Sequence, residues 1–305
     1  MSGAGPAPST TDGRRASGAA DGDGRVAGLG VVVEHLTFRY RGGTEALTDV
    51  SLTIGAGERV AIIGQNGSGK STLVRQLNGL LRPTSGAVRV AGNDVARRRV
   101  AELAALVGLA FQNPDRQIFS PTVRGEVAFG ARNLGRRRDE LDRAVAGALE
   151  AVGMTQLEGE HPYDLGYSKR KLLTIASVLA METPVVVLDE PTTGQDARGV
   201  RRIKELVTDL GARGRTVIAI SHDIRFVAES FERVVVMGRG RVVLDGRPED
   251  VFDEPAWATL STTKLTPPLA ARLGARLGLG STPTESALVA ALTARRAGPG
   301  PGGAS

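Results

Sequence analysis

One short segment restricts the possible folds of this chain more than any other: Gly-Gln-Asn-Gly-Ser-Gly-Lys-Ser-Thr at residues 64–72. An apolar run, residues 58–63, precedes it, and a stretch with helical spacing of apolar residues, 71–80, follows it. Glycines let a backbone bend sharply and approach a ligand without interference from a Cβ atom. Backbone N–H groups at the start of the helix can then hold an anion. The segment therefore predicts a phosphate-binding loop between a strand and a helix.

The charged and hydroxyl side chains of this loop suit a nucleotide with its magnesium ion. Lys70 can neutralise oxygens of the β- and γ-phosphates, and Ser71 can bind Mg²⁺ through its hydroxyl. A glycine-rich turn with a chance Lys-Ser pair is the alternative, but it leaves the flanking strand and helix unexplained. The other loop residues that we expect to contact ATP are Gly64, Gln65, Asn66, Gly67, Ser68, Gly69 and Thr72.

A second apolar run, residues 185–188, ends in the two acids Asp189 and Glu190. A buried strand would carry Asp189 to the carboxyl edge of a sheet, where ligands of α/β proteins bind. Asp189 can hold Mg²⁺ there, and Glu190 can polarise an attacking water. An ordinary acidic strand end before Pro191 is the alternative, which the phosphate loop upstream makes the weaker interpretation.

Short apolar runs alternate with helical patterns along the chain, which is typical of an α/β fold with a mainly parallel sheet. Pro83, Gly86 and Gly92 mark a small additional β segment. The first expected strand begins at 31–33 and leads to Phe38. The other expected strands are 58–63, 105–111, 185–188, 217–220 and 234–237, and the expected helices are 71–80, 141–152, 169–181 and 197–210.

Composition divides the chain into four parts. Residues 1–28 and 295–305 are rich in Gly, Ala and Pro, so we expect disordered tails. Between them we expect a main domain over residues 29–254 and a small helical appendage over residues 255–294. No cysteine is present, which excludes disulfides and thiolate metal sites. No apolar run approaches the roughly 20 residues of a membrane span, so other chains would have to hold this one at a membrane.

The formal net charge of +6 comes partly from arginine clusters at residues 97–99 and 136–138. Such clusters can bind nucleic acid or an anionic membrane surface, or they can lie on solvated helix faces. We favour solvated faces and expect no nucleic acid partner, because no RNA-binding aromatic pattern accompanies the arginines.

Taken in order, these motifs resemble the nucleotide-binding domain of ABC transporters over about residues 30–250. The resemblance implies a P-loop NTPase fold of the ABC type, with a helical signature subdomain and a small antiparallel β subdomain. It also implies that two such domains enclose ATP between them. The expected partner is therefore a second ABC ATPase subunit, in a homodimer or a heterodimer.

The resemblance assigns roles to four further residues. Tyr40 matches the aromatic residue that stacks on adenine, and Gln112 matches the glutamine that senses Mg²⁺ and moves with the membrane partner. Asp196 lies in the loop that meets the opposite subunit, and His222 matches the switch histidine at the γ-phosphate. The alternatives are a core or turn tyrosine, a plain loop amide, a helix N-terminal acid and a structural histidine. The expected catalytic set is Glu190, His222 and Gln112, with Ser71, Gln112 and Asp189 at the metal.

The signature motif departs from the family pattern Leu-Ser-Gly-Gly-Gln. Leu165 is followed by Gly166, Tyr167 and Ser168, so the usual serine is a glycine. Loss of that hydroxyl removes one charge-assisted hydrogen bond to the partner's ATP, worth about 1.5–3 kcal/mol. Either the composite site is slow, or Ser168 substitutes for the missing serine. An asymmetry of this kind suits a heterodimer and leaves a homodimer open.

Residues 113–123 (Asn-Pro-Asp-Arg-Gln-Ile-Phe-Ser-Pro-Thr-Val) and 126–130 resemble the energy-coupling factor ATPases, which drive uptake of vitamins or of cobalt and nickel ions. The resemblance implies an ATP-hydrolysing subunit with Mg²⁺, peripheral at the cytoplasmic face of the cell membrane. Its partners would be a transmembrane coupling protein and a substrate-binding membrane subunit. The alternatives are the ATPase of another ABC importer, or a soluble ABC ATPase that acts on nucleic acid or ribosomes.

Overall fold

The computed structural model describes residues 30–297. The expected N-terminal tail, residues 1–28, lies outside this range, as do residues 298–305 of the expected C-terminal tail. Helix α11 (Glu285–Ala297) continues into residues 295–297, which the sequence assigned to that tail. The helix includes them because its Ala-Arg-Arg-Ala end has good helix formers and basic residues in the last turn, which suit the helix dipole.

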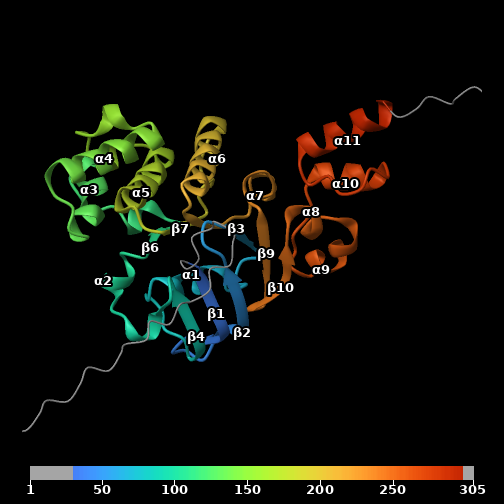
Figure 1. Cartoon of the computed structure of the whole chain (residues 1–305), viewed down its shortest axis with the longest axis horizontal. Coiled ribbons are helices and arrows are strands. Elements are labelled where there is room, and N and C mark those ends of the chain that lie inside the picture. Colours follow the sequence, from blue (N-terminus) through green and yellow to red (C-terminus); the bar gives the residue numbers. More distant parts are fainter. Residues whose placement is uncertain (1–29, 298–305) are drawn as a thin grey trace, which may run out of the picture.

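A six-stranded sheet forms the centre of the molecule (Figure 1). Its strand order is β10-β9-β3-β8-β7-β6, and all neighbouring pairs are parallel except β10 with β9. The predicted mainly parallel sheet is therefore confirmed. The strands are β3 (Arg59–Ile63), β6 (Val107–Ala110), β7 (Val185–Asp189), β8 (Thr216–Ile220), β9 (Arg233–Gly238) and β10 (Arg241–Gly246).

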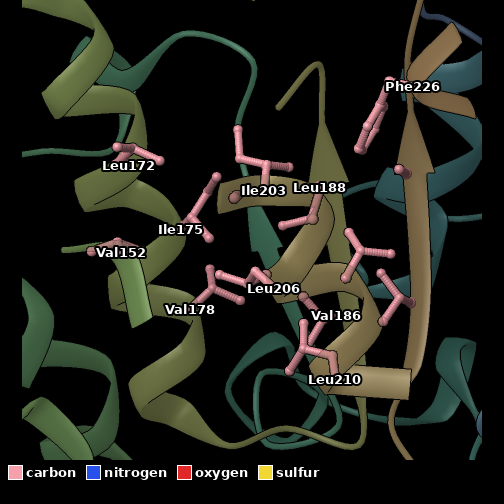
Figure 2. Close-up of a cluster of buried hydrophobic side chains, with 14 of the residues drawn as sticks. Val152, Leu172, Ile175, Val178, Val186, Leu188, Ile203, Leu206, Leu210 and Phe226 are labelled. Atoms are coloured by element: carbon pink, nitrogen blue, oxygen red, sulfur yellow. The ribbon is translucent and has the colours of Figure 1, made fainter. Parts of the chain in front are cut away.

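Both faces of the central sheet are covered, which explains why its strands read as continuous apolar runs. On β7, Val186 and Leu188 face the core formed with α5 and α6, as Figure 2 shows. Val185 and Val187 belong to the second core on the other side of the sheet. Successive side chains of one strand thus join the two cores.

The second core lies between the central sheet and an antiparallel sheet of order β2-β1-β4-β5. This sheet confirms the expected small antiparallel subdomain. Its longest strand, β2, was not predicted from the sequence, although Val50, Leu52 and Ile54 alternate with polar residues as a half-buried strand does. The strands are β1 (Val31–Arg39), β2 (Glu45–Ile54), β4 (Ser85–Val90) and β5 (Asn93–Asp94).

Helices α3, α4 and α5 pack together at one side of the sheet and form the expected helical subdomain (Figure 1, green). Helix α3 was also not predicted from the sequence, because its apolar stripe is interrupted by two glycines and a charged pair. The first five helices of the described chain are α1 (Lys70–Leu77), α2 (Val100–Leu103), α3 (Val123–Asn133), α4 (Arg138–Val152) and α5 (Tyr167–Met181).

The remaining helices continue from the central sheet to the C-terminal end of the described chain (Figure 1, orange and red). Leu260 and Ala271, from the segment expected to be a helical appendage, are buried in the same core as β7 and α5. The helices are α6 (Ala197–Ala212), α7 (Ile224–Ser230), α8 (Pro248–Val251), α9 (Trp257–Thr262), α10 (Leu269–Arg276) and α11. Single 3-10 turns are η1 (Val95–Arg97), η2 (Pro114–Arg116), η3 (Thr155–Leu157), η4 (Pro162–Asp164) and η5 (Glu254–Ala256).

Acidic residues lie beside the two arginine clusters. Arg97 pairs with Asp94, and Arg99 pairs with Glu102. Arg136 pairs with Glu182. None of the helices within residues 30–297 is long and apolar enough to cross a membrane.

Candidate nucleotide site

A pocket lies at the carboxyl ends of four neighbouring parallel strands. The phosphate loop follows β3, Gln112 follows β6, Asp189 ends β7, and His222 follows β8. Parallel strands bring their carboxyl ends to one edge of a sheet, so residues distant in sequence meet there. The pocket is lined by Asn66, Gly67, Ser68, Gly69, Lys70, Ser71, Thr72, Gln112, Asp189, Glu190, Ile220 and His222.

The phosphate loop requires glycine at two points where the backbone is crowded. Gly64 has φ 150°, and a Cβ atom there would lie 2.2 Å from the carbonyl oxygen of Met237. Gly69 has φ 102°, and its Cβ would lie 2.7 Å from the carbonyl oxygen of Ala46. Any other residue would force the loop away from its neighbours, so the curvature that aims the N–H groups of the loop depends on these glycines.

Lys70 lies inside the curve of this loop. Its Nζ donates hydrogen bonds to the carbonyl oxygens of Gly64 at 2.7 Å and Gln65 at 3.0 Å. An ammonium has three N–H donors, so one remains for a ligand. Burial lowers the pKa of Lys70, and the negative charges of Glu190 and Asp189 oppose that shift.

Asp189 is only 3% exposed, and its Oδ1 has no hydrogen-bond partner within the described chain. Burial raises its pKa, against the opposing effects of the Lys171 ammonium and the Ser71 hydroxyl. Ser71 and Gln112 line the same pocket. A carboxylate, a hydroxyl and an amide oxygen are ligands that Mg²⁺ accepts, and the unpartnered Oδ1 leaves a position for a cation. These residues therefore fit a magnesium ion.

Glu190 has the properties of a general base that works near neutral pH. It is 4% exposed, and burial raises its pKa to about 7. Its Oε2 accepts a hydrogen bond from the backbone N–H of His222 at 3.3 Å. The Nε2 of His222 lies 3.1 Å from Oε1 without the angles of a hydrogen bond, so Oε1 can still take a proton. Burial, followed by the charge of Lys70, lowers the pKa of His222 and favours the neutral ring.

Tyr40 lies beside the start of α1. Its hydroxyl is 3.0 Å from Oγ1 of Thr72, and its ring meets Phe38 edge to face at 4.9 Å between centroids. The residue is 39% exposed, so the ring is neither a core tyrosine nor covered by the chain. It is held next to the phosphate loop with surface available for stacking.

The signature residues lie outside this pocket. Gly166 is the N-cap of α5 and provides no side-chain cap. The hydroxyl of Ser168 donates to Oε1 of Gln195 at 2.9 Å, and Nε2 of Gln195 donates to the carbonyl oxygen of Ser168 at 3.0 Å. Ser168 is therefore engaged within its own chain. The ring of Tyr167 lies against Gly194.

Asp196 caps the next helix. Its Oδ1 accepts a hydrogen bond from the backbone N–H of Gly199 at 2.8 Å, at the start of α6. The expectation that this residue could be a helix N-terminal acid is confirmed. This role is compatible with a second role against another subunit.

Lys171 is a site residue that the sequence reasoning missed. It is 0% exposed, and burial lowers its pKa to about 8. Its Nζ donates to the carbonyl oxygens of Phe111, Gln112 and Asp189 at 2.8, 2.8 and 2.7 Å. The available signal was a lysine on a helix that carries no other charged residue from Leu172 onward. That signal does not identify the three oxygens, which lie 60 and 59 residues earlier, just after β6, and 18 residues later, at the end of β7.

Several known proteins resemble this chain over most of its length. The family model described as ABC transporter matches residues 47–193. An energy-coupling factor transporter ATP-binding protein of Methanocaldococcus jannaschii is 42% identical over 73% of this chain and 81% of its own. The structure of cbiO1 from Clostridium perfringens, part of the ABC transporter complex cbiONQ, matches with TM-score 0.69 and 36% identity over 82% of this chain and 99% of its own.

A dimeric ATP-binding cassette in a post-hydrolysis state, bound to ADP and phosphate, matches with TM-score 0.66 and 26% identity over 71% of this chain and 98% of its own. The chain spans only 39–43% of the length of some curated relatives, which are putative ABC transporter ATP-binding proteins of Methanosarcina and Caldanaerobacter species. Other relatives at 41–44% identity are covered over 72–94% of their length. Together these matches show that the chain belongs to the ABC transporter family of ATP-binding proteins.

Proposed function

We propose that this chain binds ATP with Mg²⁺, hydrolyses it, and so powers a membrane importer of the energy-coupling factor type. One observation supports this most strongly: the phosphate loop, two buried acids and a histidine converge on a single pocket at one edge of the sheet. Electrostatic stabilisation and positioning are the main requirements for phosphoryl transfer.

The triphosphate would lie along the glycine-lined loop. The free N–H of Lys70 would bond to a phosphate oxygen, and backbone N–H groups at the start of α1 would hold the others. Tyr40 would stack on the adenine, which is worth about 1–3 kcal/mol for a base on an aromatic ring. His222, whose lowered pKa favours the neutral ring, would donate a hydrogen bond to a group at the γ-phosphate or accept one from it.

Ser71, Gln112 and Asp189 would hold Mg²⁺, which neutralises the charge that builds up on the phosphate oxygens. Glu190 would accept the proton of the attacking water at Oε1, its unpartnered oxygen. Because burial raises the pKa of Glu190 to about 7, it accepts that proton more readily than an ordinary glutamate would.

A second ABC ATPase subunit would complete the site. Gly166, Tyr167, Ser168 and Asp196 lie outside the pocket around Lys70, which is the arrangement expected if they contact the ATP of a partner. The dimeric cassette with ADP and phosphate supports such an assembly. The engagement of the Ser168 hydroxyl by Gln195 favours a slow composite site over a substitution of Ser168 for the missing serine.

The coupling to transport rests on the relatives. Similarity to the energy-coupling factor protein and to cbiO1 supports a transmembrane coupling protein, a substrate-binding membrane subunit and a peripheral position at the cytoplasmic face of the membrane. Vitamins, cobalt and nickel ions are the candidate cargo classes. The membrane subunit, and not this chain, would select among them.

The hydrolytic role is tested by Glu190→Gln. We expect the ATPase rate of the assembled complex to fall by about 10²–10⁴-fold, the usual share of a general base, while ATP binding persists. Glu205→Gln, an exposed substitution on α6, is the matched control and should leave the rate unchanged. Normal turnover in Glu190→Gln would contradict the assignment.

The transport role is tested by purification of the chain from membranes of the source cell. We expect an integral membrane protein and an ABC ATPase subunit among its companions. Recovery with RNA or ribosomes and without membrane proteins would contradict this part of the proposal.

A further inference from the structure

Lys171 is a buried cation whose ammonium donates hydrogen bonds to backbone carbonyl oxygens. Its three N–H donors are matched by three carbonyl oxygens, from Phe111, Gln112 and Asp189. No ion pair of the described chain includes it, and it is 0% exposed. Removing an ammonium from water is costly, and leucines occupy the next two positions of the same helix. A lysine that only filled space here would therefore be less favourable than an apolar side chain of similar size.

The three oxygens belong to two strand ends that carry candidate metal ligands. Phe111 and Gln112 follow β6, and Asp189 ends β7. The residue pairing between these strands ends at Ala110 and Leu188. Beyond that pair, strand pairing no longer holds the two backbone segments together. The ammonium of Lys171 connects them instead, because it donates hydrogen bonds to carbonyl oxygens of both.

The helix that carries Lys171 begins in the signature motif. Lys171 lies about one turn from the start of α5, where Tyr167 contacts the loop around Gly194. The same side chain thus connects the signature helix to the ends of β6 and β7. A shift of α5 would displace the carbonyl groups next to Gln112 and Asp189.

We propose that Lys171 is a positioning residue for the magnesium site, because it clamps the main chain of Gln112 to that of Asp189 and joins both to the signature helix. This inference rests on the proposed function. Residues that orient metal ligands from behind typically change metal affinity or activity by 10–100-fold when they are replaced.

The test distinguishes the effect of the ammonium's position from the effect of its charge on Mg²⁺-dependent nucleotide binding. Lys171→Met keeps the stem and removes the ammonium, and Lys171→Arg keeps the charge but cannot aim three donors from one nitrogen at the carbonyl oxygens. Ser177→Ala is the matched control, since its hydroxyl bonds only to the carbonyl oxygen of Leu173 in the same helix. The measurement is the dissociation constant of a fluorescent ATP analogue for the full chain, in EDTA and in excess Mg²⁺.

For the wild-type chain and Ser177→Ala we expect Mg²⁺ to tighten binding by the same factor. In both Lys171 variants we expect that factor to shrink by about tenfold or more, with affinity in EDTA nearly unchanged. Should Lys171→Met fail to fold, Lys171→Arg alone gives the same comparison.

Two results would overturn the inference. An unchanged factor in both variants would mean that Lys171 has only a structural role. A changed factor in Lys171→Met with no change in Lys171→Arg would mean that the charge of Lys171 matters and its position does not. Failure of the proposed function is distinct, because the wild-type chain itself would then bind no analogue or show no effect of Mg²⁺.

Discussion

At the scale of single residues, Glu190 is unusual in both its backbone conformation and its burial. It has φ 50°, in the left-handed region, and it is buried beside a second acid. Both features cost free energy that a surface glutamate would not incur. The chain around it, including the backbone N–H of His222 and the charges of Lys70 and Lys171, holds it there.

The raised pKa of Glu190 predicts a pH dependence of hydrolysis. Below its pKa of about 7 the carboxyl is protonated and cannot take a proton from water, so kcat/KM should fall about tenfold per pH unit. The pKa of His222 is lowered from its usual 6.5, so this ring titrates on the acid side of Glu190. Steady-state rates from pH 5.5 to about 9 check this. In Glu190→Gln the residual rate should lose the limb, and its persistence would assign it to another group.

The same shift predicts that the site is not optimised for stability. The folded protein binds the proton of Glu190 more tightly than the unfolded chain does, so its contribution to stability declines as pH rises from the usual 4.5 to about 7. Above that range Glu190→Gln should raise the free energy of unfolding of the nucleotide-free chain by about 1–3 kcal/mol. Urea denaturation at pH 8 and at pH 4.5 measures it. An equal change at both pH values would contradict the electrostatic cause.

At the scale of elements, α5 connects the signature motif, Lys171 and the main core. Its start is weak, because Gly166 occupies the N-cap without a side chain to bond the first N–H groups. Its second turn is firmly attached through Lys171, and Ile175 and Val178 pack in the core shown in Figure 2. The helix therefore connects the signature residues at its start to the backbone at the ends of β6 and β7, through the three hydrogen bonds of Lys171.

Gly166→Ser tests the role of the missing signature hydroxyl at the start of α5. No atom lies within 4 Å of a Cβ at this position, and its φ of −62° suits any residue. The new hydroxyl should restore one charge-assisted bond to the partner's ATP, so ATPase activity of the assembled complex should rise about tenfold or more. Gly147→Ser, equally free of neighbours on α4, is the control. A fall or no change in the rate would contradict a role for the missing hydroxyl.

At the scale of the whole molecule, two cores share the central sheet, and the C-terminal helices join one of them. The division into an ABC ATPase domain at residues 29–254 and an appendage at 255–294 stays a prediction. Leu260 of α9 lies in the core that also contains Phe252 and β7, so packing crosses that boundary. An ion pair between Arg225 and Glu285 crosses it as well.

Leu260→Ala should therefore destabilise the entire chain. The residue is 0% exposed, and truncation of a buried leucine costs about 2–5 kcal/mol. Val289→Ala on α11 is the control, because a residue that is 62% exposed should change stability by less than about 0.5 kcal/mol. Urea denaturation should give one cooperative transition for both variants. A separate early transition in Leu260→Ala would indicate an independently folding appendage.

The sequence predicted the parts of the fold that depend on local patterns. Continuous apolar runs predicted the buried strands of the central sheet, because both faces of such strands are covered. Strand β2 and helix α3 were missed, since the pattern of β2 is shared with exposed strands and that of α3 is broken by glycines. Lys70, Ser71, Asp189 and Glu190 could be predicted because phosphate and magnesium chemistry requires specific side chains in consecutive positions. Gln112 and His222, which line the same pocket, were assigned only by the resemblance.

Other features were decided only when the chain folded. The ammonium of Lys171 reaches oxygens 59 and 60 residues earlier and 18 residues later, and the Ser168 hydroxyl reaches Gln195, 27 residues away. No local pattern encodes these distances, because they depend on how α5 packs against the ends of β6 and β7. The raised pKa of Glu190 has the same origin, since burial is a property of the assembled site and not of the sequence around it.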